Sequence, residues 1–170
     1  MPPSKLIDTN VPLVAMDQER PPDCQRACLA LIKRVLAGEV RVVLDTGKHV
    51  LQEYRKNMYP DPSNGFASQF LAYLLNNEYT LERVYRVKLT QDADGRYLTF
   101  PDDPRLARFD PSDKKWVALA IGYHHEMGES APIVNASDSD WLEYNSLLRE
   151  HGIIIEFLCE LADHPPSSPT

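Results

Sequence analysis

The sequence lacks long apolar runs and an excess of basic charge. No stretch approaches the roughly 18 apolar residues of a membrane-spanning helix, and residues 1–5 contain no apolar signal-peptide core, so secretion is not expected. The 18 basic and 25 acidic residues give a net charge of −7, which excludes nucleic-acid binding by bulk electrostatics alone. Any such role needs a local basic surface or a metal ion.

Cysteine is also scarce. Cys24, Cys28 and Cys159 form no CxxC pair, and their odd number leaves one thiol over. The sequence therefore predicts neither a disulfide framework nor a zinc site. Together with the missing membrane span and signal peptide, this cysteine usage predicts a protein of the reducing cytoplasm.

The chain is long and apolar enough for one folded domain. It has 170 residues, of which 43% are hydrophobic, and no internal repeat or low-complexity linker divides it. We expect a single domain over residues 1–160, in which residues 59–109 form a longer helical and hairpin insertion. Residues 161–170, rich in proline and serine, are expected to be a disordered tail.

Strand and helix patterns alternate along this domain. Apolar runs predict strands at 6–7, 40–44, 132–135 and 153–157, and residues 81–98 suggest a short strand or hairpin. Apolar spacing of three and four predicts helices from 21–23 to 36, then over 48–58, 66–76, 110–127 and 141–150. The alternation indicates an α/β fold of three layers, α/β/α, around a mostly parallel sheet.

Acidic residues recur where a parallel sheet binds its ligands, beyond the carboxyl ends of the strands. Asp8 follows the first strand, and Asp138 and Asp140 follow the strand at 132–135. Asp113 lies in the first turn of the helix over 110–127, at the edge of its sheet-facing side, and Glu53 borders the apolar stripe of its helix. Like charges gathered in this way need a cation, and oxygen ligands favour Mg²⁺ or Mn²⁺. Phosphodiester hydrolysis is the natural chemistry of such a site.

Four motifs in this order resemble the PIN-domain ribonucleases, and the resemblance spans residues 6–157. The motifs are LIDTN at 6–10, GKHVLQEYRKN at 47–57, DPSDKKWVALA at 110–120 and SDSDW at 137–141. The resemblance implies an Mg²⁺- or Mn²⁺-dependent endoribonuclease, often the toxin of a toxin–antitoxin pair and often a homodimer. The implied catalytic acids are Asp8, Glu53, Asp113 and Asp138.

The resemblance also implies individual roles. Asp8, Asp113 and Asp138 would bind the metal, with Asp140 as a further ligand, and Glu53 would complete the site or orient the attacking water. Asn10 and Ser137 would support the site through hydrogen bonds. Two features depart from the family: the segment 59–109 is longer than in a minimal PIN toxin, and Trp141 stands where the family often has phenylalanine.

Structural roles compete with each of these assignments. Asp8 could be a turn residue, Asp113 a partner of a helix dipole and Asp138 a helix cap, but Glu53 lies in the middle of its helix, where no cap is needed. Asp110 competes with Asp113 for the metal, although as the N-cap it should point away from the buried face.

Other patterns are weaker. His124 and His125 are neighbours on a helix and so diverge by about 100°, which disfavours a shared metal. A P-loop is excluded because His49 stands in the place of its Ser or Thr and Val42 in the place of its first glycine. Basic side chains flanking the acids could hold an RNA backbone or merely form a solvated face: Lys48, Arg55, Lys56, Arg105, Arg108, Lys114 and Lys115.

Two rival functions remain open. The first is a PIN-like module that binds RNA or a protein without cleaving it. The second is a metal-dependent phosphatase, although Asn10 stands where the aspartyl-phosphate phosphatases need a second aspartate.

Overall fold

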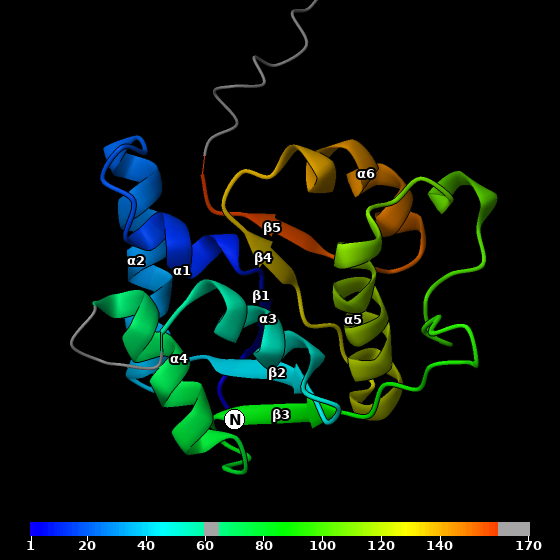
Figure 1. The fold of residues 1–170 in the computed structure, drawn as a ribbon, viewed down its shortest axis with the longest axis horizontal. Coiled ribbons are helices and arrows are strands. Elements are labelled where there is room, and N and C mark those ends of the chain that lie inside the picture. The colour runs from blue at the N-terminus through cyan, green and yellow to red at the C-terminus, as the bar shows by residue number, and fades with distance from the viewer. Residues whose placement is uncertain (60–64, 160–170) are drawn as a thin grey trace, which may run out of the picture.

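The computed structural model describes residues 1–59 and 65–159, which form a five-stranded parallel sheet between helices. The strand order is β3-β2-β1-β4-β5 (Figure 1). The strands are β1 (Ser4–Ile7), β2 (Arg41–Asp45), β3 (Val84–Val87), β4 (Ile133–Asn135) and β5 (Ile155–Phe157). The expected three-layer α/β/α fold with a parallel sheet is confirmed.

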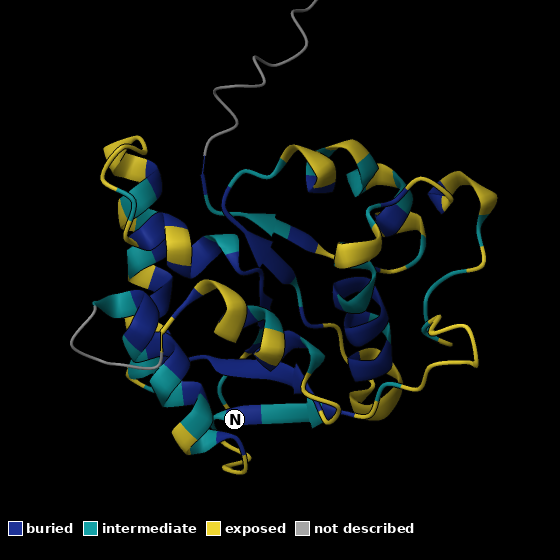
Figure 2. Cartoon of the chain, in the orientation of Figure 1, coloured by how far each residue is buried: buried dark blue, intermediate teal, exposed yellow. Residues whose placement is uncertain are grey.

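The central strands are buried on both faces because helices cover both. Every residue of β2 and β4 is buried, as the dark colour of the middle of the sheet shows in Figure 2. Leu6 of β1 lies opposite Ile133 of β4, and Val42 of β2 lies opposite Val84 of β3. These pairings align the carboxyl ends of neighbouring strands at one edge of the sheet.

Six α-helices connect the described strands. They are α1 (Asn10–Ala15), α2 (Pro22–Leu36), α3 (His49–Asn57), α4 (Phe66–Asn77), α5 (Lys114–Met127) and α6 (Ser139–Glu150). Helices α1, α2 and α4 pack against one another, whereas α5 packs on β2, β3 and β4 and contacts α3 (Figure 1). Short 3₁₀ turns at Pro104–Leu106 and Pro111–Asp113 precede α5.

The structure differs from the expectations in two local features. Helix α1 was not predicted: no helix was expected between the strand at 6–7 and the helix from 21–23, yet α1 begins at Asn10. In the ambiguous segment, β3 pairs with β2, and the hairpin is limited to one antiparallel bridge between Gln91 and Tyr97. The expected tail, residues 161–170, lies outside the described residues.

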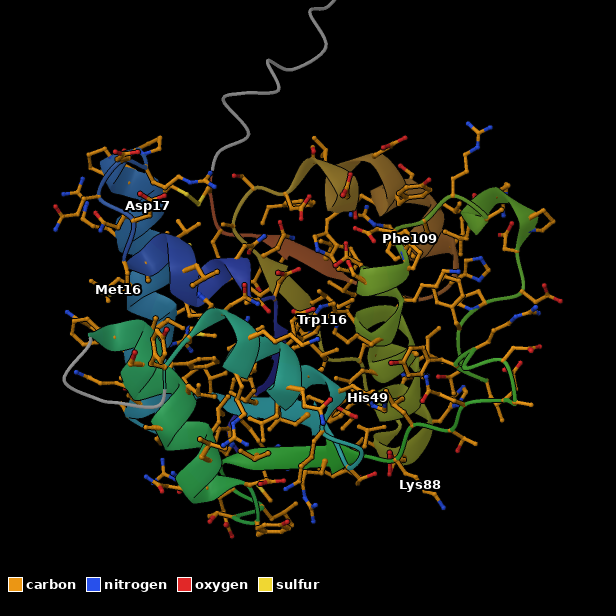
Figure 3. The ribbon with its side chains drawn as sticks, in the orientation of Figure 1. Met16, Asp17, His49, Lys88, Phe109 and Trp116 are labelled. Carbon is orange, nitrogen blue, oxygen red and sulfur yellow. A yellow bond between two sulfur atoms is a disulfide. The ribbon has the colours of Figure 1, made fainter. Side chains whose placement is uncertain are left out.

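The prediction that the cysteines stay unpaired is wrong. Cys24 of α2 and Cys159, two residues after β5, form a disulfide, drawn in yellow in Figure 3, and Cys28 is a buried free thiol. Cysteines 135 positions apart show no pairing in sequence spacing because the fold alone brings them together. Disulfides are uncommon in cytosolic proteins, so the cysteines no longer favour the cytoplasm. In the described part of the chain, no helix has the length and apolar character needed to cross a membrane.

Candidate acidic metal site

The candidate site lies where the strand order reverses. From β1 the chain builds β2 and β3 on one side, then returns to place β4 and β5 on the other. Ligands of open α/β sheets bind at such a point, outside the carboxyl ends of the strands. Asp8 follows β1 directly, and Asp138 lies three residues after the end of β4.

Asp8 is the most buried acid of the site, with 7% of its surface exposed. The Asn10 backbone N–H donates to its Oδ1 at 3.0 Å, and the Trp141 indole Nε1–H donates to its Oδ2 at 2.7 Å. Burial raises the pKa of Asp8 to about 6, and the charges of Glu53 and Asp138 add to this rise, while the two hydrogen bonds oppose it. The carboxylate is therefore fixed in position but costly to ionise without a cation.

Glu53 reaches the site from the middle of α3. Its Oε2 accepts a hydrogen bond from the Thr9 hydroxyl, and its Oε1 lies 2.5 Å from the Lys115 Nζ of α5. The neighbouring Tyr54 is fully buried and donates its hydroxyl to the carbonyl of Ile7 in β1. These contacts fix the face of α3 that carries Glu53 against β1 and α5.

Asp113 is the centre of the acidic cluster. It lies at the start of α5, half-buried, and its carboxylate lies within 4.8 Å of carboxylate oxygens of Asp110 and Asp140. The pKa of Asp113 is raised to about 7, first by burial and then by four neighbouring negative charges, those of Asp8, Asp110, Asp138 and Glu53. The acids predicted from separate elements thus lie close enough to affect one another's ionisation.

Asp138 and Asp140 open α6. Asp138 is the N-cap, because its Oδ1 accepts from the Asp140 backbone N–H at 2.8 Å, and its own N–H donates to the Asn135 Oδ1 at 3.1 Å. Asp140 is exposed, and its pKa is raised by desolvation first and then by the charges of Asp138, Asp110 and Glu143. Asp138 therefore has the capping role that was considered as an alternative, and it faces the other acids as well.

Asn10 joins the two central strands at the site. Besides its N–H bond to Asp8, its side-chain Oδ1 accepts from the Ala136 backbone N–H at 3.0 Å. Ser137 is half-buried beside it. Both border an open hollow of about 200 Å³, lined by Asn10, Val14, Arg20, Ala136, Ser137 and Asp138. Arg20 places a cation in this wall and was not anticipated from the sequence.

The structure corrects the expected position of Asp110. Its capping role is found, since Oδ1 accepts from the Ser112 backbone N–H and hydroxyl, each at 2.9 Å. A cap in the 3₁₀ turn does not point away from the site, however, and Asp110 replaces Asp8 and Asp138 in the tightest group with Asp113 and Asp140. Sequence reasoning also missed the donors Thr9 and Lys115.

The flanking basic residues do not form one surface. Lys115 pairs with Glu53 inside the site, whereas Lys48 pairs with Glu78 at 3.4 Å, and Arg105 pairs with Asp103 and Glu150, each at 2.9 Å. The Lys114 ammonium lies 5.2 Å from the centre of the Phe100 ring. Five of the seven are exposed, and Lys114 and Lys115 are partly buried: the exposed ones are Lys48, Arg55, Lys56, Arg105 and Arg108.

The donor set suits a hard divalent cation. The group around Asp113 consists of carboxylates, and among the described residues no histidine or cysteine joins it. Carboxylate oxygens fit Mg²⁺ or Mn²⁺, which take one or two carboxylates and keep several waters. Asp110, Asp113 and Asp140 lie close enough to share such an ion, and the charges of Asp8 and Asp138 act on Asp113 from beside them.

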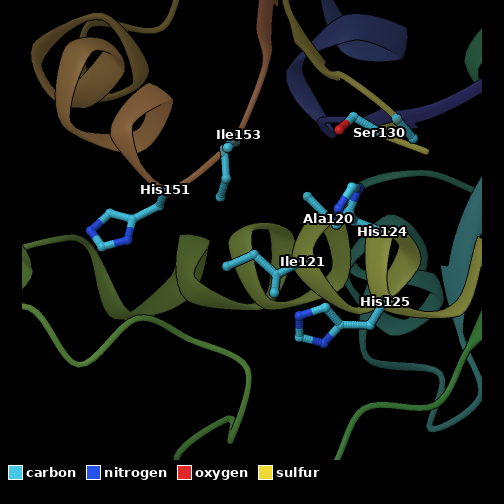
Figure 4. A pocket seen from close by; sticks show the side chains of 9 residues that line it. Ala120, Ile121, His124, His125, Ser130, His151 and Ile153 are labelled. Atoms are coloured by element: carbon cyan, nitrogen blue, oxygen red, sulfur yellow. The ribbon is translucent and has the colours of Figure 1, made fainter. Parts of the chain in front are cut away.

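A second hollow, shown in Figure 4, lies apart from these acids. It is bordered by residues that precede β4 and β5, at the opposite edge of the sheet, and by α5. His124 and His125 point apart there, as their adjacent positions predict, and His151 pairs with Asp103 at 2.9 Å. No group of histidines among residues 1–59 and 65–159 has metal-binding distances.

Comparison of the chain with protein-family models, with curated proteins and with solved structures finds no match.

Proposed function

We propose that the protein is a PIN-like endoribonuclease that hydrolyses RNA phosphodiester bonds with Mg²⁺ or Mn²⁺. The observation that carries the proposal is the meeting of Asp8, Glu53, Asp113 and Asp138, from four separate elements, at the reversal of the strand order. The raised pKa of Asp113 and of Asp8 supports it, because carboxylates this costly to ionise indicate a site built for a cation.

The residues divide into distinct roles. Asp8, Asp113 and Asp138 would hold the ion, with Asp140 and Asp110 beside them. A bound divalent ion would supply an activated water and neutralise charge on the attacked phosphate. Glu53 would orient the water, held by Thr9 and Lys115. Arg20, in the wall of the hollow beside Asp138, could bind a phosphate of the RNA backbone.

The resemblance extends the proposal to partners. A toxin with a cognate antitoxin protein, working as a homodimer in the cytoplasm, is the biological setting that it implies. Of the RNA contacts expected from sequence, Lys48, Arg55, Lys56 and Arg108 are exposed. Lys48, Lys114 and Lys115 also have contacts within the chain.

The test is cleavage of a panel of tRNA, rRNA fragments and single-stranded oligonucleotides with Mn²⁺, Mg²⁺ or EDTA. Asp8→Asn and Glu53→Gln keep side-chain shape and remove one charge, and each should lower the rate by roughly 100-fold or more. Glu126→Gln, which removes an exposed acid of α5, is the matched control and should cleave normally. Metal-independent cleavage, or full activity of both site variants, would refute the proposal.

One observation favours a second candidate, a PIN-like module that binds RNA or protein without cleavage. Lys115 already provides a cation to Glu53 from within the chain. RNA binding by the wild type without cleavage of any substrate, unchanged in Asp8→Asn, would support this candidate. A metal-dependent phosphatase would instead hydrolyse small phosphomonoesters, so p-nitrophenyl phosphate belongs in the same panel.

A further inference from the structure

Three sulfur atoms converge between α2 and the chain that follows β5. Cys24 and Cys28 are one helical turn apart on α2, and Cys159 lies opposite them. The three Sγ atoms lie within 4.8 Å of one another, and all three residues are buried, with Cys28 fully enclosed. The disulfide uses two of the three sulfurs, which leaves Cys28 of the apolar core as a free thiol beside it.

The spacing of the unbonded pair matches two ligands of one metal ion. The Sγ atoms of Cys28 and Cys159 are 4.0 Å apart. Two sulfurs that each bind an ion at about 2.3 Å lie roughly 3.8–4.0 Å apart when the angle at the metal is tetrahedral or trigonal. Reduction of the Cys24–Cys159 bond would let these two sulfurs separate to a similar distance.

The chemistry of the trio selects the class of ion. Thiolates are soft ligands that favour Cu(I) and Zn²⁺ over Mg²⁺. Structural zinc almost always takes four ligands, but among the described residues only the three cysteines form this group. Three sulfurs in an apolar, buried setting fit a soft ion of low coordination number. Burial raises the pKa of the Cys28 thiol to about 11, and the charge of Arg20 opposes this rise.

We propose that Cys24, Cys28 and Cys159 form a binding site for a soft monovalent cation, Cu(I), that opens when the disulfide is reduced. A dithiol reductant becomes its own disulfide while Cys24 and Cys159 each gain a proton and an electron. Binding of Cu(I) then releases the thiol protons to solvent and forms three metal–sulfur bonds. Oxidation of the pair leaves Cys28 alone and closes the site.

The site lies close to the acidic centre, but the two share no proposed metal ligand. The Cys159 backbone N–H donates to the Ala136 carbonyl at 3.0 Å, two residues before Asp138. The end of β5 is therefore held beside the loop that carries Asp138, by the disulfide in the oxidised protein and by the bound ion in the reduced protein. Hard carboxylates bind Cu(I) poorly, so titration with Cu(I) reports the cysteines alone.

The experiment is an anaerobic titration of the full chain with Cu(I), in competition with a chromogenic Cu(I) chelator. Reduced wild-type protein should bind one ion per chain, with the ultraviolet charge-transfer absorption of Cu(I)–thiolate bonds. Loss of a residue that supports a metal ligand typically lowers metal affinity by roughly 10–100-fold. Cys28→Ser removes a ligand itself, so the reduced variant should bind Cu(I) at least about 100-fold more weakly than the reduced wild type. The oxidised wild type should bind as weakly as this variant.

The controls separate loss of the site from loss of the fold. Cys28→Ser keeps Cys24 and Cys159, and its oxidised form should show the wild-type circular dichroism and melting temperature. Asp8→Asn should bind Cu(I) like the wild type. Thiol counting in denaturant should give one free thiol for oxidised wild-type protein and three after reduction. No Cu(I) binding by reduced wild type, equal binding by Cys28→Ser, or equal binding before and after reduction would overturn the proposal.

Discussion

The carboxylates at the reversal of the strand order differ in the groups that surround them. Asp8 is bound by a backbone N–H and by the indole of Trp141, whereas Glu53 is bound by a hydroxyl and an ammonium. Asp113 has other carboxylates near it, and burial first and then their charges raise its pKa to about 7. A metal ion would therefore act most strongly on Asp113.

Trp141 gives the sharpest prediction at the scale of single residues. Trp141→Phe keeps an aromatic ring against Phe109, 5.6 Å away between ring centres, but removes the N–H that orients Asp8. Such an outer partner of a metal ligand is worth roughly 10–100-fold in affinity, so we expect Mn²⁺ to bind about tenfold more weakly. Electron paramagnetic resonance of free Mn²⁺ measures this directly.

Tyr144→Phe is the control for this change. Tyr144 is on the same helix, and its ring is 5.1 Å from that of Phe109. It should bind Mn²⁺ as the wild type does. If Trp141→Phe also bound Mn²⁺ with wild-type affinity, the indole would have a packing role only.

The sequence predicts the acids of the site better than it predicts their neighbours. Asp8 and Asp138 follow strands, and the ends of strands can be predicted from apolar runs. We therefore expected these two acids at the same edge of the sheet. Lys115 and Thr9 carry no such signal, because which side chain meets Glu53 depends on how α5 packs against α3. Asp110 was set aside because its capping role was taken to exclude a place in the cluster, and the 3₁₀ turn permits both.

At the scale of elements, α3 depends on an acid outside the catalytic set. Lys48, the residue before α3, has a positive φ of 64°, and no side chain at that position caps the helix. Asp45, at the end of β2, takes this role: Oδ2 accepts from the His49 N–H at 2.9 Å and Oδ1 from the Val50 N–H at 3.0 Å. The start of α3, and with it the position of Glu53, is thus fixed from the sheet.

Asp45→Ala should therefore destabilise the protein and impair the site together. Loss of a cap costs about 1–2 kcal/mol, and the part-buried His49 N–H and the buried Val50 N–H would be left without their acceptor. Chemical denaturation measures the loss of stability, and the cleavage assay measures the effect on Glu53. Asp23→Ala, an exposed acid in the first turn of α2 that pairs with Arg26, should change stability by less than about 0.5 kcal/mol. Equal effects of the two changes would contradict the capping role.

The elements themselves were predicted where their patterns are long. The apolar spacing of α2 and α5 and the runs of β2 and β4 leave few alternatives. Helix α1 has six residues and contains Pro12 and two valines, so local propensity argues against it, and packing of Val11 and Val14 into the core stabilises it instead. β3 is an edge strand of four residues with Arg86 in it, which weakens its pattern.

At the scale of the whole molecule, the acids make stability depend on pH and metal together. Asp8 and Asp113 have pKa values of about 6 and about 7, above the ordinary 3.8, so the folded, metal-free protein binds protons that the unfolded chain releases. This contribution to stability is fully present below about pH 3.8 and is lost as the pH rises through 6 and 7. For Asp8 it is roughly 3 kcal/mol.

Denaturant unfolding in EDTA should accordingly show lower stability at pH 8 than at pH 5. Mn²⁺ binds the ionised carboxylates, so adding it should restore stability at pH 8 and have little effect at pH 5. Asp8→Asn should have a smaller dependence on pH. A stability in EDTA that rises from pH 5 to pH 8 would show that these carboxyls are not held neutral by the fold.

The disulfide also changes the connectivity of the molecule. Because Cys24 and Cys159 are 135 positions apart, the bond closes most of the chain into a ring, and a cross-link of this span reduces the entropy of the unfolded chain by an amount worth roughly 5 kcal/mol. The exposed loop at residues 92–96 belongs to this ring. A protease that cuts there leaves a single covalent species on a non-reducing gel, and the two fragments separate only when the disulfide is reduced.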